Sequence, residues 1–243
     1  MMRAGFLTLC LSAIPTFASA QTMQWTDKGF VTLNLGVQSG SHDLNTSSTF
    51  TIYDETATVT SSQNVKGGGF FDIGGAYRVW GQNLLAGVSV SHVTSDADVA
   101  ITGSIPDPLV FDAPRTVNTT QSDAGHAETA IHIDAIWMIP VANKLDVGVF
   151  AGPTIFLIKQ DAVSGLDASD VTEPGPTLNS PLNEVSKTTA GFNLGIDVQY
   201  LIGRKWGVGG LARYSWGSAS IVEGSEKLTV GGFQIGAGAR FRF

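Results

Sequence analysis

The stretch from Leu228 to Phe243 reads LTVGGFQIGAGARFRF. From position 233 onward, the odd-numbered residues are all apolar, whereas the even-numbered residues are glutamine, glycine and arginine. Strict alternation of this kind places the two sets on opposite faces of a β-strand. A strand with aromatic rings on one face and arginines on the other fits a position between lipid and a polar lumen. We therefore compare the rest of the chain with a transmembrane β-barrel.

Seven further runs alternate in the same way. They cover residues 30–38, 70–79, 84–92, 127–139, 145–157, 189–201 and 206–216. Each run is near the length that crosses a membrane as a tilted strand. The connections alternate between long and short, with a moderate last one, which is typical of outer-membrane barrels with short periplasmic turns and long external loops. The sequence predicts an all-β fold, an eight-stranded antiparallel up-and-down barrel.

The first long connection contains two shorter runs, 50–53 and 56–60, around Asp54-Glu55. A ten-stranded barrel would have to include both, but each run is too short to cross the hydrocarbon core. We therefore expect a hairpin that projects above the membrane. Segments 99–105 and 109–117 are expected to extend the neighbouring strands outward in the same way.

The N-terminus has the pattern of a secretory signal peptide. Arg3 precedes an apolar run from Phe6 to Phe17, and Ala18-Ser19-Ala20 provides a small-residue cleavage site. A retained membrane anchor is disfavoured because the apolar run is too short for a membrane-spanning helix. We expect a cleaved signal peptide at 1–20 and one barrel domain at 21–243. The single cysteine, Cys10, lies in the signal peptide, so disulfides are not expected in the domain.

Charge patterning separates a membrane barrel from a soluble one, which alternation alone does not do. Only 14% of the residues are charged, and the formal net charge is −7. An acidic chain of this kind is not expected to bind nucleic acid. Every charged residue within the eight runs falls on the polar phase. The apolar phase is therefore expected to face lipid.

Aromatic residues on the apolar phase recur at a fixed interval. Trp206 and Trp216 are ten residues apart, as are Phe233 and Phe243. At about 3.3 Å per residue and a tilt near 40°, ten residues rise about 25 Å, the height of an outer-membrane apolar band. The predicted membrane-interface aromatics are Tyr77, Trp137, Tyr200, Trp206, Trp216, Phe233, Phe241 and Phe243.

The polar phase predicts a lumen charge network, because an eight-stranded barrel is only wide enough for side chains to fill it. The predicted members are Asp72, Arg78, Asp134, Asp146, Asp197, Arg213, Arg240, Arg242 and His132. Four acids and four arginines in a narrow tube should pair, since an unpaired buried charge is costly. A plugged lumen is the main prediction. A narrow ion-conducting path is the alternative.

With its eight alternating strands, loop asymmetry and terminal Ala239-Arg240-Phe241-Arg242-Phe243, the chain resembles the small outer-membrane barrels typified by the OmpA transmembrane domain and the OmpX/Ail proteins. The resemblance implies that the barrel assembly machinery recognises the C-terminal strand. One departure is that the chain stops at Phe243, without the periplasmic peptidoglycan-binding domain of full-length OmpA-type proteins. A cell-wall tether is therefore not expected.

Catalytic and metal patterns are weak. Glu128 and His132 share a strand face, but residues four apart in a strand are about 13 Å apart, too far for a dyad. Ser91-His92 suggests a barrel lipid hydrolase, yet adjacent strand residues point to opposite faces. The acidic loop motifs Asp96-x-Asp98 and Asp167-x-x-Asp170 have too few ligands for a dedicated calcium loop. No cofactor is expected, because the glycines do not form a phosphate-binding loop.

These patterns predict a non-enzymatic protein of the bacterial outer membrane. The acidic external loops are expected to present contacts to other cells, host proteins or lipopolysaccharide. Expected partners are outer-membrane lipid and lipopolysaccharide, the assembly machinery, and an external ligand that the sequence does not identify. A small porin-like channel is the second hypothesis, and a lipid-modifying barrel enzyme is the third.

Overall fold

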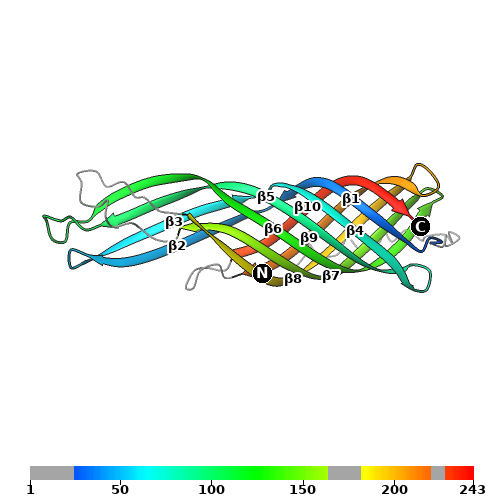
Figure 1. The fold of residues 1–243 in the computed structure, drawn as a ribbon, viewed down its shortest axis with the longest axis horizontal. Helices are drawn as coiled ribbons and strands as arrows, with labels where there is room; N and C mark the ends of the chain where they lie inside the picture. Colours follow the sequence, from blue (N-terminus) through cyan, green and yellow to red (C-terminus); the bar gives the residue numbers. More distant parts are fainter. Residues whose placement is uncertain (1–24, 164–181, 220–227) are drawn as a thin grey trace, which may run out of the picture.

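The computed structural model describes residues 25–163, 182–219 and 228–243. The expected signal peptide, 1–20, lies outside these residues. The described chain forms one antiparallel β-sheet (Figure 1). Its strands are β1 (Gly29–Ser39), β2 (Ser41–Ile52), β3 (Glu55–Lys66), β4 (Gly69–Trp80), β5 (Leu84–Ile105), β6 (Arg115–Ala142), β7 (Leu145–Val163), β8 (Leu182–Leu201), β9 (Trp206–Ala219) and β10 (Leu228–Arg242).

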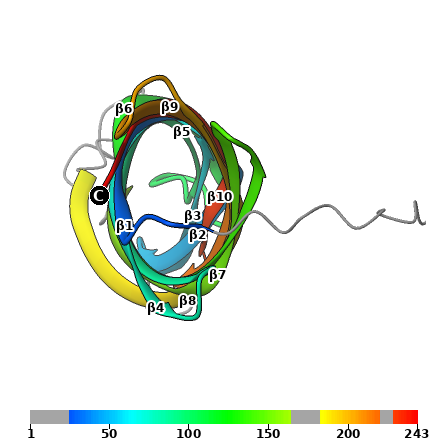
Figure 2. The same ribbon diagram turned by 90° about the vertical axis from the view of Figure 1, so that its right-hand side faces the viewer.

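Eight of these strands close into a ring. The order is β5-β4-β1-β10-β9-β8-β7-β6, and a further β6–β5 pairing completes it (Figure 2). The first and last ring strands, β1 and β10, are antiparallel neighbours, with Phe30 opposite Arg242 and Ser39 opposite Phe233. Each ring strand contains one of the predicted alternating runs. The prediction of an eight-stranded antiparallel barrel is confirmed.

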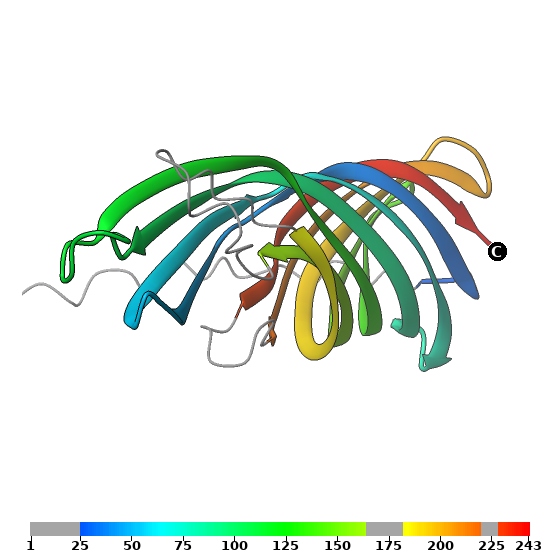
Figure 3. The ribbon, with the colours of Figure 1, turned by 60° about the vertical axis from the view of Figure 1, so that its left-hand side comes forward.

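The other two strands, β2 and β3, form a hairpin beyond the ring. β3 pairs with β5 from Thr58–Ser104 to Gln63–Val99, and β2 pairs with β3 along its whole length. The two hairpin strands and the upper parts of β5 and β6 make a four-stranded extension that projects from one end of the ring (Figures 1 and 3). The predicted hairpin is therefore present. Its strands are 12 residues long, more than twice the length of the predicted runs. The prediction was too short because the Ser- and Thr-rich halves of both strands lack apolar alternation.

The strands β5 and β6 run into the extension, with 22 and 28 residues. The predicted extension of strand 84–92 through residues 99–105 is confirmed. The expectation that residues 109–117 would form strand is wrong for its first part, because β6 begins at Arg115 and residues 106–114 connect it to β5. Asp112 in this connection has a positive φ of 59°, a conformation that does not fit a strand.

Short turns join the strands at the other end of the ring. The turns at 81–83 and 202–205 lie in the gaps between the predicted runs. The third turn is shorter than the gap of residues 140–144 between the runs 127–139 and 145–157, because β6 continues to Ala142. Pro140 is accommodated next to a register shift between Pro140 and Ala142, a place where a strand tolerates a residue without an N–H group.

The two faces of the ring differ as the alternation predicts. Large apolar side chains cover the outside, including Leu35, Trp206 and Phe192 at 66%, 63% and 62% exposed, respectively. The inside holds charged and amide side chains, with Arg240 fully buried. An apolar belt around a polar interior is the arrangement of a transmembrane barrel. In the described segments, no helix is both long enough and apolar enough to cross a membrane.

Inward-facing aromatic rings pack where neighbouring strands carry glycine. Phe70 lies against Gly36 and Gly236, where a Cβ atom would come within 2.6 Å and 2.8 Å of the ring, respectively. Phe156 fills the corresponding space beside Gly191 and Gly217. These rings belong to two apolar clusters that lie inside the barrel with the polar groups. A third cluster, centred on Val59, Val99, Ile101, Ile105 and Ala124, is the core of the extension.

Candidate functional site: the lumen network

Three arginine–aspartate pairs bridge the interior of the ring. Arg213 pairs with Asp72 (Nη1–Oδ2, 2.9 Å), Arg240 with Asp197 (Nη2–Oδ2, 2.5 Å) and Arg242 with Asp146 (Nη1–Oδ2, 2.5 Å). All six side chains are almost completely buried. The acids come from β4, β8 and β7, whereas the arginines come from β9 and β10. The network therefore links the last two strands to β4, β7 and β8.

Asn34 on β1 joins two of these pairs. Its Nδ2 donates to Asp72 Oδ1 at 2.8 Å, and its Oδ1 accepts from Arg240 Nη1 at 2.6 Å. The guanidinium of Arg213 also donates to Ser89 Oγ at 2.9 Å and packs over the Phe150 ring. Charge-assisted bonds of this kind are about twice as strong as neutral ones. The centre of the lumen is therefore one connected structure of charges, amides and a hydroxyl.

Arg242 closes the end of the lumen that carries the short turns. Besides Asp146, its guanidinium donates to Gln199 Oε1 at 3.1 Å and lies 3.8 Å from Asp27 Oδ2. The guanidinium carbon lies 4.5 Å from the centre of the Trp25 ring. Trp25 is buried, although it precedes the first strand, so the chain before β1 folds into this mouth of the barrel.

Among the predicted acids and arginines of the network, Arg78 and Asp134 do not join an ion pair in the described part of the chain. Arg78 lies half-buried at the short-turn mouth, where its Nη1 donates to the Trp25 carbonyl oxygen at 3.2 Å. Asp134 is buried farther up the lumen and accepts from Asn193 Nδ2 at 2.9 Å. The expected pairing of four acids with four arginines is therefore wrong for the fourth pair, because the two side chains lie at different heights of the barrel.

His132 is fully buried in a chain of hydroxyl and amide groups. One ring nitrogen, Nε2, lies 3.1 Å from Ser91 Oγ, and the other, Nδ1, lies 2.9 Å from Thr154 Oγ1. Asn193 connects Thr154 to Asp134. Ser91 on β5 thus contacts His132 on the neighbouring strand β6. The side chain of His92 points outward and contacts Thr129. Spacing along a single strand does not predict the contact between Ser91 and His132, because it joins β5 to β6.

Glu128 and His126 form a further layer above His132 that was absent from the predicted site. His126 lies between Gln160 Oε1 (2.6 Å) and Glu128 Oε1 (3.0 Å). The other carboxylate oxygen of Glu128 accepts from the backbone N–H of Gly231 on β10 at 3.1 Å and from Gln38 Nε2 at 3.3 Å. The signal was available in the sequence, since positions 126, 128 and 132 share one phase of β6.

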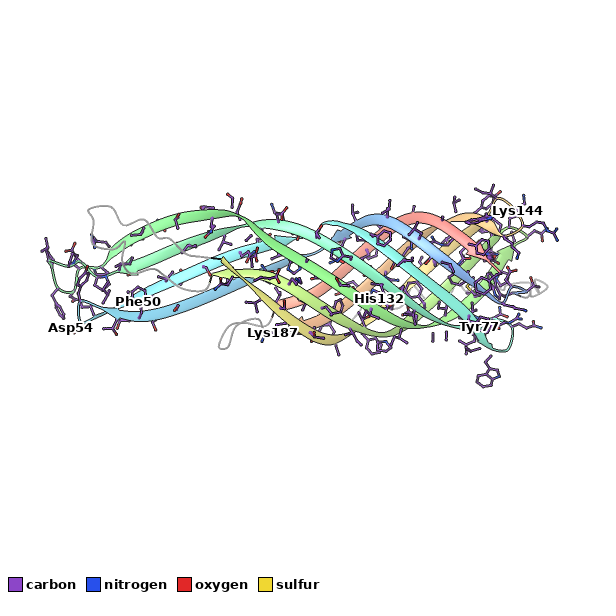
Figure 4. All side chains as sticks on the ribbon, viewed as in Figure 1. Phe50, Asp54, Tyr77, His132, Lys144 and Lys187 are labelled. Atoms are coloured by element: carbon purple, nitrogen blue, oxygen red, sulfur yellow. The ribbon has the colours of Figure 1, made fainter. Side chains whose placement is uncertain are left out.

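A cavity of about 40 Å³ lies at the level of Arg213, Asp72 and Asp134, walled on other sides by Phe150 and Leu211. This volume has room for a few water molecules, because a cavity needs about 10–15 Å³ of water-accessible space to hold one. Figure 4 labels His132 within the ring.

The predicted interface aromatics lie on the outside of the ring. The Trp206 ring packs against the Phe241 ring at a tilt of 54°, with the ring centres 4.6 Å apart. Those more than two-fifths exposed are Tyr77, Trp137, Tyr200, Trp206, Trp216, Phe233 and Phe243, and Phe241 is intermediate. Figure 4 shows Tyr77 and Lys144 both at the short-turn end, on opposite edges of the ring in that view. These positions fit a belt of aromatic side chains at lipid–water boundaries.

The acidic motifs do not form a metal site in the part of the chain that the structure covers. No group of three or more His, Cys, Asp or Glu side chains with metal-binding geometry occurs among those residues. Asp96 and Asp98 are exposed on β5. Asp167 and Asp170 lie outside the described residues.

Comparison with known protein families decides the assignment. A family model described as "Outer membrane protein beta-barrel domain" matches residues 5–241. The chain belongs to this family. Membership of the outer membrane protein beta-barrel family places the protein in the bacterial outer membrane. A search of curated proteins found no match.

Solved structures of other outer-membrane barrels are similar to this family member at low sequence identity. Neisserial surface protein A matches at 13% identity and a TM-score of 0.45, over 88% of this chain and 97% of that one. The attachment invasion locus protein Ail of Yersinia pestis matches at 10% identity and 0.37, over 88% and 99%. OprG of Pseudomonas aeruginosa matches at 9% and 0.43, over 91% and 99%.

Proposed function

We propose that this outer-membrane protein is a closed, non-enzymatic barrel that holds a β-sheet extension above the membrane for surface contacts. The observation that carries the proposal is the network of buried side chains inside the ring. Three buried ion pairs and the layers around His132 and Glu128 cross the ring, and the central cavity is only about 40 Å³. A permeating ion would have to break these charge-assisted bonds, since each removed partner leaves a buried charge unpaired.

The proposal also accounts for the length of the strands outside the ring. β5 and β6 continue well past the apolar belt, and β2 and β3 add two strands to them. The extension has its own apolar core, with Ile101 and Ile105 buried. A loop needed only to connect two ring strands would not require such a core. The extension is therefore a folded surface for contacts.

Single-channel recording in planar lipid bilayers tests the closed lumen. The folded wild-type protein is expected to give no steady conductance steps. Arg213→Ala removes the side chain that bridges Asp72, Ser89 and the Phe150 ring, and is expected to produce intermittent openings. Arg204→Gln, in an exposed short turn, removes one arginine without touching the lumen and is the matched control. Steady wild-type channels that Arg213→Ala abolishes would support the small-channel function instead.

A labelling experiment tests the display of the extension. Ser48 is exposed on β2, and Arg204 is exposed in a short turn at the opposite end of the ring. In intact cells, a membrane-impermeant maleimide is expected to label Ser48→Cys and to spare Arg204→Cys. The reverse pattern would contradict the proposed orientation.

The Ser91–His132 contact does not support a hydrolase. Hydrolysis requires the nucleophile to reach its substrate, and Ser91 is only 1% exposed inside the lumen. The Ser91→Ala variant, which lacks the hydroxyl group, tests this directly. Hydrolysis of outer-membrane lipid by the wild type, lost in Ser91→Ala, would restore the enzyme hypothesis.

A further inference from the structure

The end of the extension farthest from the ring carries large apolar side chains in solvent. Leu109, Val110 and Phe111, in the connection between β5 and β6, are 91%, 56% and 78% exposed, and Tyr53 in the β2–β3 turn is 38% exposed. The apolar belt of the ring does not reach them. From His92 to Ile105, β5 rises by roughly 40 Å along the strand at about 3.3 Å per residue. Lipid around the ring therefore does not cover these side chains.

Hydrogen bonds fix the two connections that carry this apolar group. The backbone N–H of Asp112 donates to Glu55 Oε1 at 2.7 Å, which ties the β5–β6 connection to the β2–β3 turn. Asp107 Oδ1 accepts from the N–H groups of Leu109 (2.8 Å) and Val110 (3.3 Å), and its Oδ2 lies 3.5 Å from Arg115 Nε. We call this unit, Tyr53–Glu55 with Asp107–Asp112, the distal tip. Asp54 marks it in Figure 4.

The charge of the distal tip is one-sided. The unit that carries the apolar side chains contains four acids, Asp54, Glu55, Asp107 and Asp112, and Arg115 next to it lies 3.5 Å from Asp107. Carboxylates around an apolar group disfavour contact with an anionic lipid surface, which attracts bases. They favour a partner with basic groups next to apolar ones, because opposite charges steer and orient the encounter.

We propose that the distal tip binds a cationic amphipathic polypeptide segment, in which lysine or arginine residues are interleaved with large apolar residues. Exposed, contiguous apolar side chains with a polar rim mark interaction sites on soluble surfaces. Phe111 and Leu109 provide the apolar anchors, and the exposed carboxylates of Asp54 and Asp112 pair with the partner's bases. The inference rests on the proposed function, since the tip must face the medium outside the cell.

The test uses the full barrel domain in phosphatidylcholine nanodiscs and a fluorescent helical peptide of leucine and lysine. Binding is measured by fluorescence anisotropy, and binding to empty nanodiscs is subtracted. Two variants are expected to weaken binding by at least about tenfold, or about 1.4 kcal/mol. Leu109→Ser/Phe111→Ser removes the apolar anchors without changing charge. Asp54→Asn/Asp112→Asn removes two charges, and asparagine tolerates the positive φ at both positions.

A matched control separates this site from general attraction to an acidic protein. Asp96→Asn/Asp98→Asn removes the same charge from exposed positions lower on β5 and is expected to leave the affinity within about twofold. An equal loss in this control would overturn the proposal, as would no detectable binding by the wild type. The proposal would also be overturned if the tip bound phosphatidylcholine vesicles more tightly than it binds the peptide.

The outcome is distinguishable from a failure of the proposed function. If the barrel is silent in planar bilayers and Ser48→Cys is labelled outside the cell, absent peptide binding refutes only the distal-tip site. If Ser48→Cys is labelled from the periplasm, the proposed function fails first, whatever the peptide does.

Discussion

Arg240 on β10 extends across β9 and binds Asp197 on β8. Two hydrogen bonds join them: Arg240 Nε donates to Asp197 Oδ1 at 3.2 Å, and Nη2 donates to Oδ2 at 2.5 Å. The strand between them carries Gly209 at the crossing point. A Cβ atom there would lie 2.7 Å from Arg240 Nε. The missing side chain on β9 therefore makes room for an ion pair between strands that are not neighbours.

Removing one partner of this ion pair is expected to destabilise the barrel. Arg240→Met leaves Asp197 buried without its cation, which should cost about 3–5 kcal/mol of unfolding free energy. Arg240→Met/Asp197→Leu removes both charges, and the double variant is expected to recover much of the loss. Urea unfolding in detergent micelles, followed by tryptophan fluorescence, measures each value. Additive losses in the double variant would show that the two side chains do not interact.

Gly209→Ala is expected to lower the unfolding free energy by about 1–3 kcal/mol, because the new methyl group meets the guanidinium of Arg240 and a backbone carbonyl of β8. The adjacent Gly210→Ala is the matched control, since its Cβ faces outward and has only one neighbour, at 3.7 Å. The same unfolding experiment compares the two. Equal effects of the two substitutions would place the cost in backbone conformation rather than in the lumen.

The tryptophans are expected to differ in their access to lipid. The sequence has five, so four Trp→Phe substitutions leave one at a time. In brominated phosphatidylcholine, Trp206 and Trp216 should be quenched most by bromine near the headgroups, because both are exposed at the ends of the apolar belt. Trp25, buried beneath Arg242, should be quenched little. Strong quenching of Trp25 would contradict its place inside the barrel mouth.

Deleting residues 41–66 is expected to leave the ring intact, because β2 and β3 are not part of it. The ends are already adjacent, since the N–H of Gln38 donates to the Gly68 carbonyl oxygen at 2.8 Å. The shortened protein should keep heat-modifiable migration in mild detergent, the behaviour of a closed barrel. Loss of that behaviour would mean that the hairpin is required for closure.

The alternation of apolar and polar residues predicted the ring strands and the face of each residue, because side-chain direction in a strand depends only on position along it. The full length of the two hairpin strands was harder to predict. In β2, residues 45–49 are Asn, Thr, Ser, Ser and Thr, which show no contrast between the two faces. Their strand conformation comes from pairing with β3, a contact that no pattern in β2 itself records.

The candidate site shows the same limit. Arg240 and Asp197 could both be assigned to the lumen from sequence, but their partnership depends on the register of three strands. In the same way, the registers of β4, β5 and β6 separate Arg78 from Asp134 and bring Ser91 to His132. Gly209 had no distinguishing feature among the 29 glycines, and only the Arg240 side chain next to it shows its role.

The distribution of the ion pairs over the chain has a consequence for the order of events during biogenesis. The acids on β4, β7 and β8 are synthesised before the arginines on β9 and β10 that pair with them. Until β10 reaches β1, where Phe30 meets Arg242, the curled sheet stays open and its carboxylates stay hydrated. Closure of the seam and expulsion of water from the lumen then occur in one step. Because that contact spans nearly the whole chain, this step is expected to limit the folding rate.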